Sequence, residues 1–211
     1  MIRPLALSAA LLFLSIISYA AAPSSVPSHL PVIACFGDSI TAGYGVAPGH
    51  TYPDDLQRDL DARGYHYHVV NAGISGNTTK DAVDRLSAIL GLQPAIVIVE
   101  FGGNDGLRGI PITDTRRNLD IIVATLVRAR SRVVLAGITL PPNYGPDYIR
   151  QFDETYSLTA AKYHAPLLPM LYANIYTVPA AIQDDGIHPT AKGDSLLAQN
   201  FLPLLLPLLH K

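Results

Sequence analysis

A regular alternation of short apolar runs with amphipathic segments is the strongest constraint on how this 211-residue chain folds. The apolar runs lie at residues 32–36, 95–101, 132–138 and 165–170, and the β-rich run "HYHVV" lies at residues 66–70. Segments with helical spacing of apolar residues lie at 52–64, 78–91, 113–130 and 147–163, and from near 189 onward. Strands that alternate with helices form parallel sheets, and near-continuous apolar strands are buried on both faces. The pattern predicts a three-layer α/β/α sandwich with about five parallel strands.

The sheet is expected to be of the flavodoxin-like kind. Residues 78–91 predict one continuous helix that ends at Gly91. The C-terminal helix is expected to be disrupted by Pro203 and Pro207, because proline lacks the backbone donor that a helix needs. The leucines of this tail are expected to pack against the sheet, with contact to a membrane or a partner as the alternative.

Composition narrows the class of protein. Apolar residues make up 49% of the chain and charged residues 15%, which suits a compact globular fold and argues against disorder. The formal net charge of −2 provides no basic surface for nucleic acid. Cys35 is the only cysteine, so no intramolecular disulfide forms, and its apolar surroundings predict a small buried hydrophobe and not a nucleophile.

The N-terminus has the layout of a secretory signal peptide. Basic Arg3 precedes an apolar run over residues 5–17, and small residues follow. We expect residues 1–20 to be removed by cleavage after Ala20, with Ala22 as the second site. Residues 21–31 then form a linker, and residues 32–211 form the domain. The protein is expected to be exported, to the periplasm or outside the cell, without stable membrane insertion; the alternative is an uncleaved membrane anchor.

Motif-like sequences lie where the predicted strands end. "GDSI", "NAGISGN" and "GGND" follow the first three predicted strands, and an open parallel sheet binds its ligand at those ends. Ser39 in "GDSI" becomes a nucleophile only beside a base. "DDGIHPT" supplies His188 with Asp185 three residues before it, so that a turn lets the carboxylate reach one ring nitrogen and leaves the other for Ser39.

Each motif also has an interpretation without catalysis. Asp and Ser after a strand often cap a helix, and "DGIHP" alone is compatible with a turn or with a metal site that includes Asp184. His66 and His68 alternate along one strand, but no nearby acid or cysteine completes a metal site. The joint presence of the serine and histidine motifs at strand ends favours catalysis.

"GGND" adds an uncharged donor. The amide of Asn104 suits a developing oxyanion, and the N–H of Gly73 in "NAGISG" is a candidate second donor. The alternative is a pair of tight turns, which Asn and Gly commonly form.

The four blocks "GDSITAG", "NAGISG", "GGND" and "DGIHP" resemble, in order, those of the SGNH or GDSL hydrolase superfamily. "EFGGNDGLRG", "LPPNYG" and "QDDGIHP" are more specifically similar to its bacterial thioesterase I/lysophospholipase/arylesterase branch. The resemblance implies Ser39 as nucleophile, His188 as base and Asp185 as its orienting acid. It also implies an oxyanion hole made by the N–H groups of Ser39 and Gly73 and the side chain of Asn104.

We expect a hydrolase of small acyl esters and thioesters that needs no metal or organic cofactor. The residues expected to contact substrate flank the motifs or lie on the loop after the fourth strand: Asp38, Ile74, Asn77, Leu140, Tyr144 and Ile187. Asn77 stands where close relatives are expected to carry an acid, which bears on substrate preference. The alternatives are a carbohydrate O-acetylesterase, a non-catalytic envelope-binding module and a nucleotide-binding module. "GDSITAG" is poor in the donors that the nucleotide-binding module requires.

Overall fold

The computed structural model describes residues 29–211, and within them the chain forms a sheet of five parallel strands. The strands are β1 (Val32–Gly37), β2 (His68–Asn71), β3 (Ile96–Glu100), β4 (Arg132–Ala136) and β5 (Leu167–Leu168). Their order, β2-β1-β3-β4-β5, is that of flavodoxin-like sheets. The predicted fold class is confirmed. The expected signal peptide and residues 21–28 of the expected linker lie outside the described residues and stay predictions.

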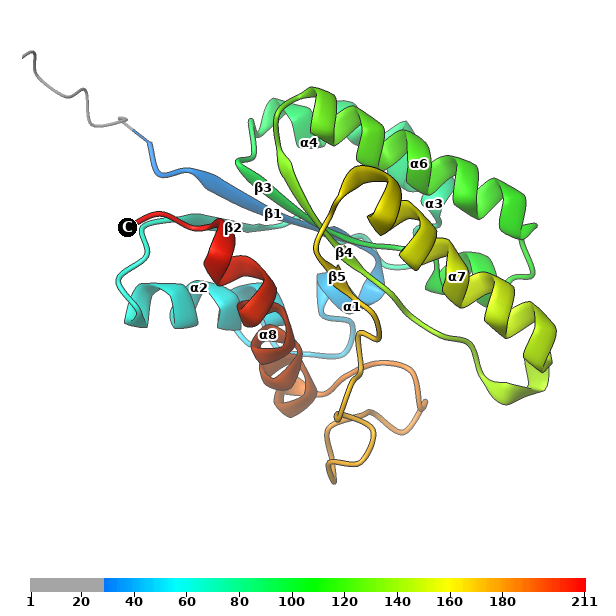
Figure 1. The fold of residues 1–211 in the computed structure, drawn as a ribbon. Helices are drawn as coiled ribbons and strands as arrows, with labels where there is room; N and C mark the ends of the chain where they lie inside the picture. Colours follow the sequence, from blue (N-terminus) through cyan, green and yellow to red (C-terminus); the bar gives the residue numbers. More distant parts are fainter. Residues whose placement is uncertain (1–28) are drawn as a thin grey trace, which may run out of the picture.

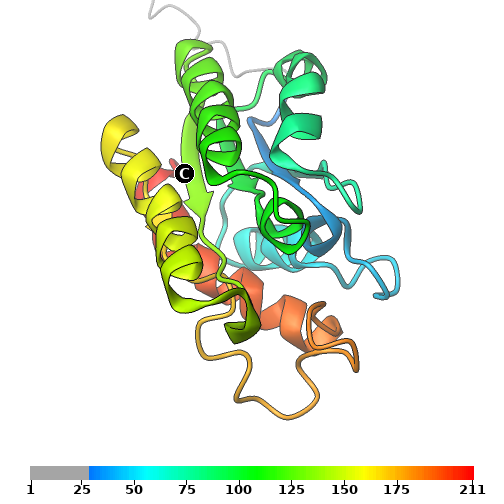
Figure 2. The same cartoon turned by 90° about the vertical axis from the view of Figure 1, so that its right-hand side faces the viewer.

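Helices cover both faces of the sheet (Figure 1). One face carries α2 (Tyr52–Ala62) and α8 (Ala191–Leu205). The other carries α3 (Thr79–Asp84), α4 (Leu86–Gly91), α6 (Ile112–Arg128) and α7 (Pro146–Tyr163). The short helices α1 (Ser39–Ala42) and α5 (Gly103–Leu107) directly follow β1 and β3, and two single 3-10 turns lie at Pro142–Tyr144 and Leu206–Leu208. Figure 2 shows the sheet between the two helical layers.

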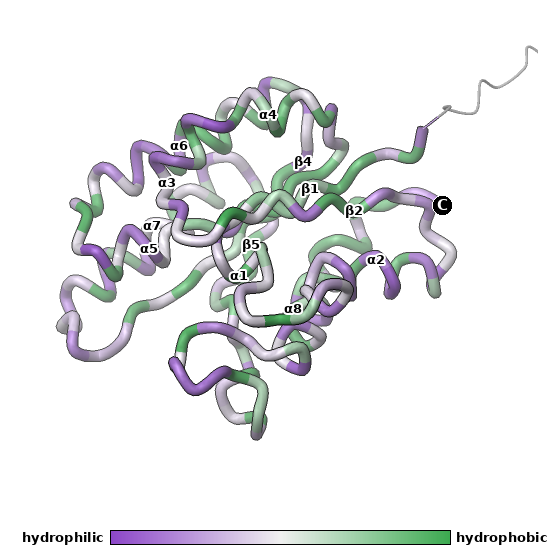
Figure 3. The backbone as a smooth tube through the Cα atoms, turned by 180° about the vertical axis from the view of Figure 1, so that it is seen from behind, coloured by the Kyte–Doolittle hydropathy of each residue, from purple (hydrophilic) through white to green (hydrophobic). Residues whose placement is uncertain are grey.

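Alternate side chains of the central strands enter two separate cores. Ile33 and Cys35 of β1 pack toward α2 and α8, whereas Ala34 and Phe36 pack toward the opposite helices. This burial on both faces explains why the central strands are mostly apolar (Figure 3). Cys35 is fully buried, and burial raises the pKa of its thiol to about 12, in agreement with its predicted role as a core residue.

Two predictions about helices are wrong. The helix expected over residues 78–91 is broken at Arg85, which leaves the helical conformation (φ −108°, ψ 12°) and separates α3 from α4. Pro203 does not disrupt the C-terminal helix, because α8 begins at Ala191 and continues through it to Leu205; the regular helix does end before Pro207, which lies in the 3-10 turn that follows. Pro203 lies on the exposed side, and its neighbours Leu202 and Leu205 are buried in the core, so their packing holds the helix across the missing hydrogen bond.

The leucine-rich tail packs into the core as predicted. Leu197, Leu202, Leu205 and Leu209 are buried against the sheet in the layer that α2 shares. No helix within residues 29–211 has the length and apolar character needed to cross a membrane.

Candidate active site

Ser39 lies at the carboxyl edge of the sheet, as its motif predicts. Asp38 precedes it and caps α1, since its Oδ1 accepts a hydrogen bond from the N–H of Ile40 at 3.1 Å. Gly37 ends β1, and a Cβ there would lie 1.9 Å from Thr41 Oγ1 and 2.5 Å from Glu100 Oε2, so a larger residue would displace the hydrogen-bonded pair that these side chains form. The turn thus places the Ser39 hydroxyl at the start of α1, beyond the end of β1.

Asp185 and His188 are brought to Ser39 by the loop before α8. Ser39 Oγ lies 2.8 Å from His188 Nε2, and His188 Nδ1 lies 2.6 Å from Asp185 Oδ2. The other carboxylate oxygen, Asp185 Oδ1, accepts the N–H groups of Ile187 at 2.9 Å and His188 at 3.0 Å. The backbone of the loop therefore positions the Asp185 carboxylate, and the carboxylate in turn orients the His188 ring. Serine, histidine and aspartate are hydrogen-bonded in series.

The electrostatics of this loop favour an ionised aspartate. Burial acts to raise the pKa of Asp185, but the hydrogen bonds from the His188 ring and from the two backbone N–H groups outweigh it and lower the pKa to about 2. The ring of Tyr44 packs on the His188 ring, with centroids 4.6 Å apart. On the other side of the loop, the buried Tyr172 donates its hydroxyl to the carbonyl of Ile187 at 2.8 Å.

Two buried acids lie beneath the serine. Glu100 Oε2 accepts the Thr41 hydroxyl at 2.8 Å and the Asp38 N–H at 3.3 Å. Burial raises the pKa of Asp38 to about 6, and burial together with the charge of Asp38 raises the pKa of Glu100 well above its usual range. These shifts disfavour two adjacent charges beneath the serine, and Glu100 supports the turn through its hydrogen bonds to Thr41 and Asp38.

Asn104 lies at the start of α5, beside Ser39. Its Nδ2 donates to Asp38 Oδ2 at 3.0 Å and to the carbonyl of Asn77 at 3.0 Å. An amide nitrogen has only two hydrogens, so both are engaged with the protein here. The amide still lines the pocket that contains Ser39 and His188.

Gly73 does not lie where an oxyanion donor is needed. Its N–H donates to Asn71 Oδ1 at 3.0 Å, and the residue packs against α1 so closely that a Cβ would lie 2.2 Å from Ala42 N. Gly76, three residues on, lines the pocket with Ser39 and Asn104. Its N–H has no hydrogen-bond acceptor among residues 29–211, and neither has that of Ser39. The structure therefore favours Gly76 over Gly73 as the second backbone donor.

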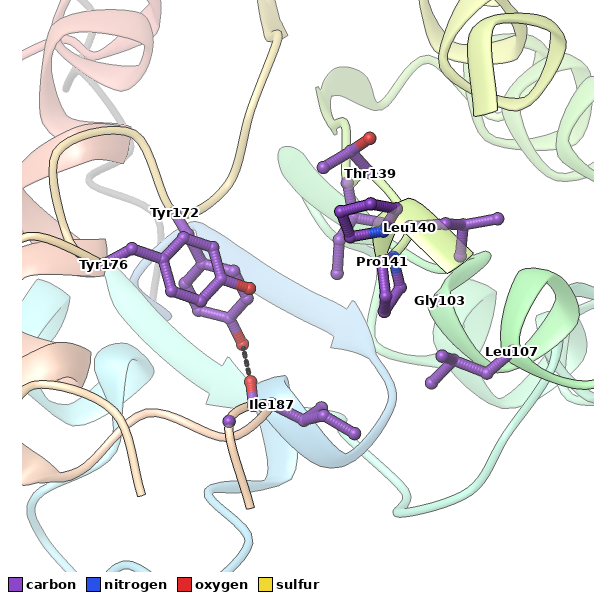
Figure 4. A pocket seen from close by; sticks show the side chains of 11 residues that line it. Gly103, Leu107, Thr139, Leu140, Pro141, Tyr172, Tyr176 and Ile187 are labelled. Carbon is purple, nitrogen blue, oxygen red and sulfur yellow. Dashed lines mark hydrogen bonds between the residues drawn. The ribbon is translucent and has the colours of Figure 1, made fainter. Parts of the chain in front are cut away.

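Two cavities meet at the site. The first, about 280 Å³, contains Ser39 and His188, and the second, about 410 Å³, extends from it between two walls. Gly103, Leu107, Ile138 and Ile187 line both cavities. Figure 4 shows the second cavity, with Tyr172 and Tyr176 on one wall and Thr139, Leu140, Pro141 and Leu107 on the other.

The residues expected to contact substrate fall into two groups. Leu140 and Ile187 line the 410 Å³ cavity, and their contact with substrate stays a prediction. Of the other four, Asp38 lines the 280 Å³ cavity, but it is buried and accepts a hydrogen bond from Asn104. Asn77 lines neither cavity and offers its carbonyl to Asn104.

Ile74 and Tyr144 line neither cavity. Ile74 is exposed, and the Tyr144 hydroxyl donates to the carbonyl of Leu107 at 2.8 Å. Tyr144 therefore supports a residue of the cavity wall and does not form the wall.

His66 and His68 lie just before and at the start of β2. His66 precedes β2, which begins at His68, so the two do not alternate along one strand. Within residues 29–211, no group of three or more His, Cys, Asp or Glu side chains is arranged to hold a metal ion.

Sequence reasoning missed Gly76 and Tyr172. "NAGISGN" contains two glycines at the same strand end, and spacing alone does not tell which of them faces the serine. Tyr172 lies in an irregular segment 13 residues before Asp185, where no periodicity signals a contact. The positive φ of Gly76, +81°, marks the turn that brings it to the pocket.

A serine, a histidine and an aspartate joined in this way at the carboxyl edge of a parallel sheet define a serine hydrolase. Residues 35–196 match the GDSL-like lipase/acylhydrolase family. The chain belongs to this family, and the sequence-based resemblance is confirmed.

Individual relatives agree with this assignment. The chain is 41% identical over 174 residues to esterase TesA of Pseudomonas aeruginosa, which covers 82% of this chain and 87% of the relative. It is 35% identical over 200 residues to thioesterase 1/protease 1/lysophospholipase L1 of Escherichia coli, with 94% and 92% covered. The crystal structure of esterase EstA from Pseudoalteromonas sp., inhibited by monoethylphosphonate, superposes with a TM-score of 0.79 at 31% identity and covers 83% of this chain and 97% of EstA.

Proposed function

We propose that the protein hydrolyses carboxylic esters and thioesters of short to medium acyl chains through an acyl-enzyme on Ser39. The observation that carries the proposal is the unbroken series of hydrogen bonds from Ser39 Oγ through both nitrogens of His188 to Asp185, at 2.8 and 2.6 Å. A serine becomes nucleophilic at neutral pH when such a base accepts its proton.

The reaction follows from this geometry in two halves. Ser39 Oγ attacks the acyl carbonyl while its proton passes to His188 Nε2. The Asp185 carboxylate accepts a hydrogen bond from Nδ1–H of His188, which orients the ring, and it stabilises the imidazolium that forms. His188 then gives its proton to the leaving alcohol or thiol, and the bond from the acyl carbon to that group breaks. Water, deprotonated by His188, attacks the acyl-enzyme in the same way and releases the acid and Ser39.

The oxyanion of each tetrahedral intermediate is held by three donors: the N–H groups of Ser39 and Gly76 and the amide of Asn104. The two backbone groups have no acceptor among residues 29–211 and are available at once. Asn104 is engaged with Asp38 and Asn77, so one of these hydrogen bonds gives way when it donates to substrate. The contact with Asp38 keeps the amide in place when the contact with the Asn77 carbonyl is exchanged.

The second cavity supports an acyl chain as the group bound beside the serine. Leu107, Ile138, Leu140 and Ile187 give it apolar walls, and the hydroxyl of Tyr172 is already bonded to the carbonyl of Ile187. An acetylated sugar requires polar partners. Of the three hydroxyls that line this cavity, that of Thr139 donates to Asp153 Oδ2 at 3.1 Å and that of Tyr172 to the carbonyl of Ile187, which leaves that of Tyr176.

A substrate panel on the purified protein tests this assignment. Acyl-CoA thioesters, aryl esters, lysophospholipids and acetylated sugars are compared by kcat/KM. The proposal requires short to medium acyl esters and thioesters to rank above acetylated sugars. The opposite ranking favours the carbohydrate O-acetylesterase.

We also propose that the protein is exported, to the periplasm or outside the cell, after cleavage near Ala20. The basic, apolar and small-residue regions of the first 22 residues support this assignment.

A further inference from the structure

Arg85 is the half-buried cation behind the site, and the catalytic mechanism does not use it. Its guanidinium donates from Nη1 to the carbonyl of Ala72 and from Nη2 to the carbonyl of Gly37, each at 2.7 Å. Within residues 29–211, no carboxylate lies close enough to form an ion pair with it. A half-buried charge bonded only to two backbone carbonyls is costly, which indicates a specific structural task.

The two carbonyls belong to the two segments that carry the backbone donors of the oxyanion hole. Gly37 stands two residues before Ser39, and Ala72 stands four residues before Gly76. The carbonyl of Gly37 also accepts the N–H of Ile74 at 3.1 Å, so the loop after β2 is already tied to the end of β1. Arg85 adds a second hydrogen-bonded link between the same two segments.

The surroundings of Arg85 hold its guanidinium at this position. The charge lies 4.5 Å from the ring centroid of Phe36 and 5.5 Å from that of Phe101, near the ends of β1 and β3. The break between α3 and α4 also occurs at Arg85. The helical layer thus departs from regular geometry at the residue that bridges the strand ends.

We propose that Arg85 is a positioning residue that fixes the distance between the Ser39 and Gly76 N–H groups, and so preorganises the oxyanion hole. The inference rests on the proposed function. Arg85 touches no substrate atom and acts through the two backbone segments. Its fork spans two carbonyls in a fixed plane, which the single ammonium of lysine does not reproduce.

The test compares Arg85→Lys and Arg85→Met with the wild-type protein on p-nitrophenyl butyrate. Displaced donors weaken transition-state binding and leave ground-state binding intact. We expect kcat to fall about 10- to 100-fold in both variants, with KM changed by less than about twofold. The inhibition constant for phenylboronic acid, which forms a tetrahedral adduct on a serine, should rise by a similar factor.

Arg116→Met is the matched control. Arg116 also holds backbone and side-chain oxygens of a neighbouring segment, the Gln151 carbonyl at 2.6 Å and Thr155 Oγ1 at 3.1 Å, but it joins α6 to α7 away from both cavities. It should lower the melting temperature and leave kcat and the boronate constant unchanged.

Several outcomes would overturn the proposal. A folded Arg85 variant with wild-type kcat, or one whose KM rises in step with the loss of kcat/KM, removes the positioning role. If neither Arg85 variant folds, the positioning role is also rejected, and Arg85 is a structural residue. Failure of the proposed function is recognised separately, because the wild-type protein itself would then not hydrolyse the ester.

Discussion

Asn104 is the residue whose role the structure makes most specific. Asn104→Ala removes a donor from the proposed oxyanion hole together with its hydrogen bonds to Asp38 and Asn77. We expect kcat to fall about 10²–10³-fold, with little change in KM, because the amide is aimed at the oxyanion and not at the ground-state carbonyl. Steady-state kinetics and melting temperature are measured on the same purified variant.

Asn118→Ala provides the comparison for this prediction. Asn118 is also buried and donates to Thr79 Oγ1 at 3.1 Å, but it lines neither cavity of the site. Its loss should lower the melting temperature and spare kcat. If Asn104→Ala behaves like Asn118→Ala, Asn104 is structural, and the N–H groups of Ser39 and Gly76 are the remaining donors.

For single residues, the sequence predicts which side chains meet at the site, but it does not identify every hydrogen-bond donor of the proposed oxyanion hole. Ser39, Asn104 and His188 come together because they lie at, or return to, the carboxyl edge of one parallel sheet, and strand ends are recognisable in the sequence. The choice between Gly73 and Gly76 depends on the path of the loop after β2. That path is set by the hydrogen bond from Ile74 to Gly37 and by the bridge from Arg85. Neither contact leaves a periodic signal.

Among the helices, α8 contains a buried carboxyl group whose burial lowers the stability of the fold. Asp194 lies in its first turn with no exposed surface, and neither carboxylate oxygen has a side-chain hydrogen-bond partner among residues 29–211. Burial raises its pKa to about 8, and the nearby Asp55 and Asp54 act in the same direction.

We expect Asp194→Asn to stabilise the protein in a pH-dependent way. The folded state holds the proton up to about pH 8, whereas the unfolded chain releases it near pH 4. Wild-type stability therefore falls as the pH rises between these values and stays level above them. The variant should gain roughly 1–3 kcal/mol at pH 9 and almost nothing at pH 4.

Urea unfolding at both pH values measures this gain. Asp147→Asn is the control, because Asp147 lies in the first turn of α7 with its side chain 91% exposed. It should show no gain at either pH. An equal effect of the Asp194 variant at pH 4 and pH 9 would rule out a buried, proton-holding carboxylate.

The helices also show where periodicity stops being informative. Residues 78–91 carry one continuous apolar stripe, and Ala82, Leu86 and Ile89 are buried as that stripe predicts. The break at Arg85 coincides with its contacts to strand ends 13 and 48 residues away in sequence, which a local pattern does not contain. Pro203 is the opposite case, because tertiary packing of α8 overrides a strong local helix breaker.

For the whole molecule, the alternation of strands and helices was sufficient to predict the sheet, its parallel pairing and its two helical layers. Each crossover helix buries an apolar face against the sheet, so the order of elements leaves few topologies. The two-residue β5 is recognised less well, because so short an edge strand has little pattern of its own.

Export is a prediction about the chain as a whole. N-terminal sequencing of the protein recovered from outside the cytoplasm should begin at Ala21, or at Pro23 if cleavage follows Ala22. A full-length product that begins at Met1 and stays in the cytoplasm contradicts the signal-peptide interpretation.

The central claim is that ester hydrolysis proceeds through the hydroxyl of Ser39, and the measurement that tests it most directly is turnover by Ser39→Ala. The hydroxyl contacts His188 Nε2 and fills no core space, so the variant should keep the wild-type melting temperature. We predict that it loses measurable hydrolysis of a chromogenic ester and is no longer labelled by a serine-reactive phosphonate, whereas the wild-type protein is labelled at Ser39 alone. Retained turnover in a folded Ser39→Ala protein, or wild-type labelling at another serine, would contradict the account.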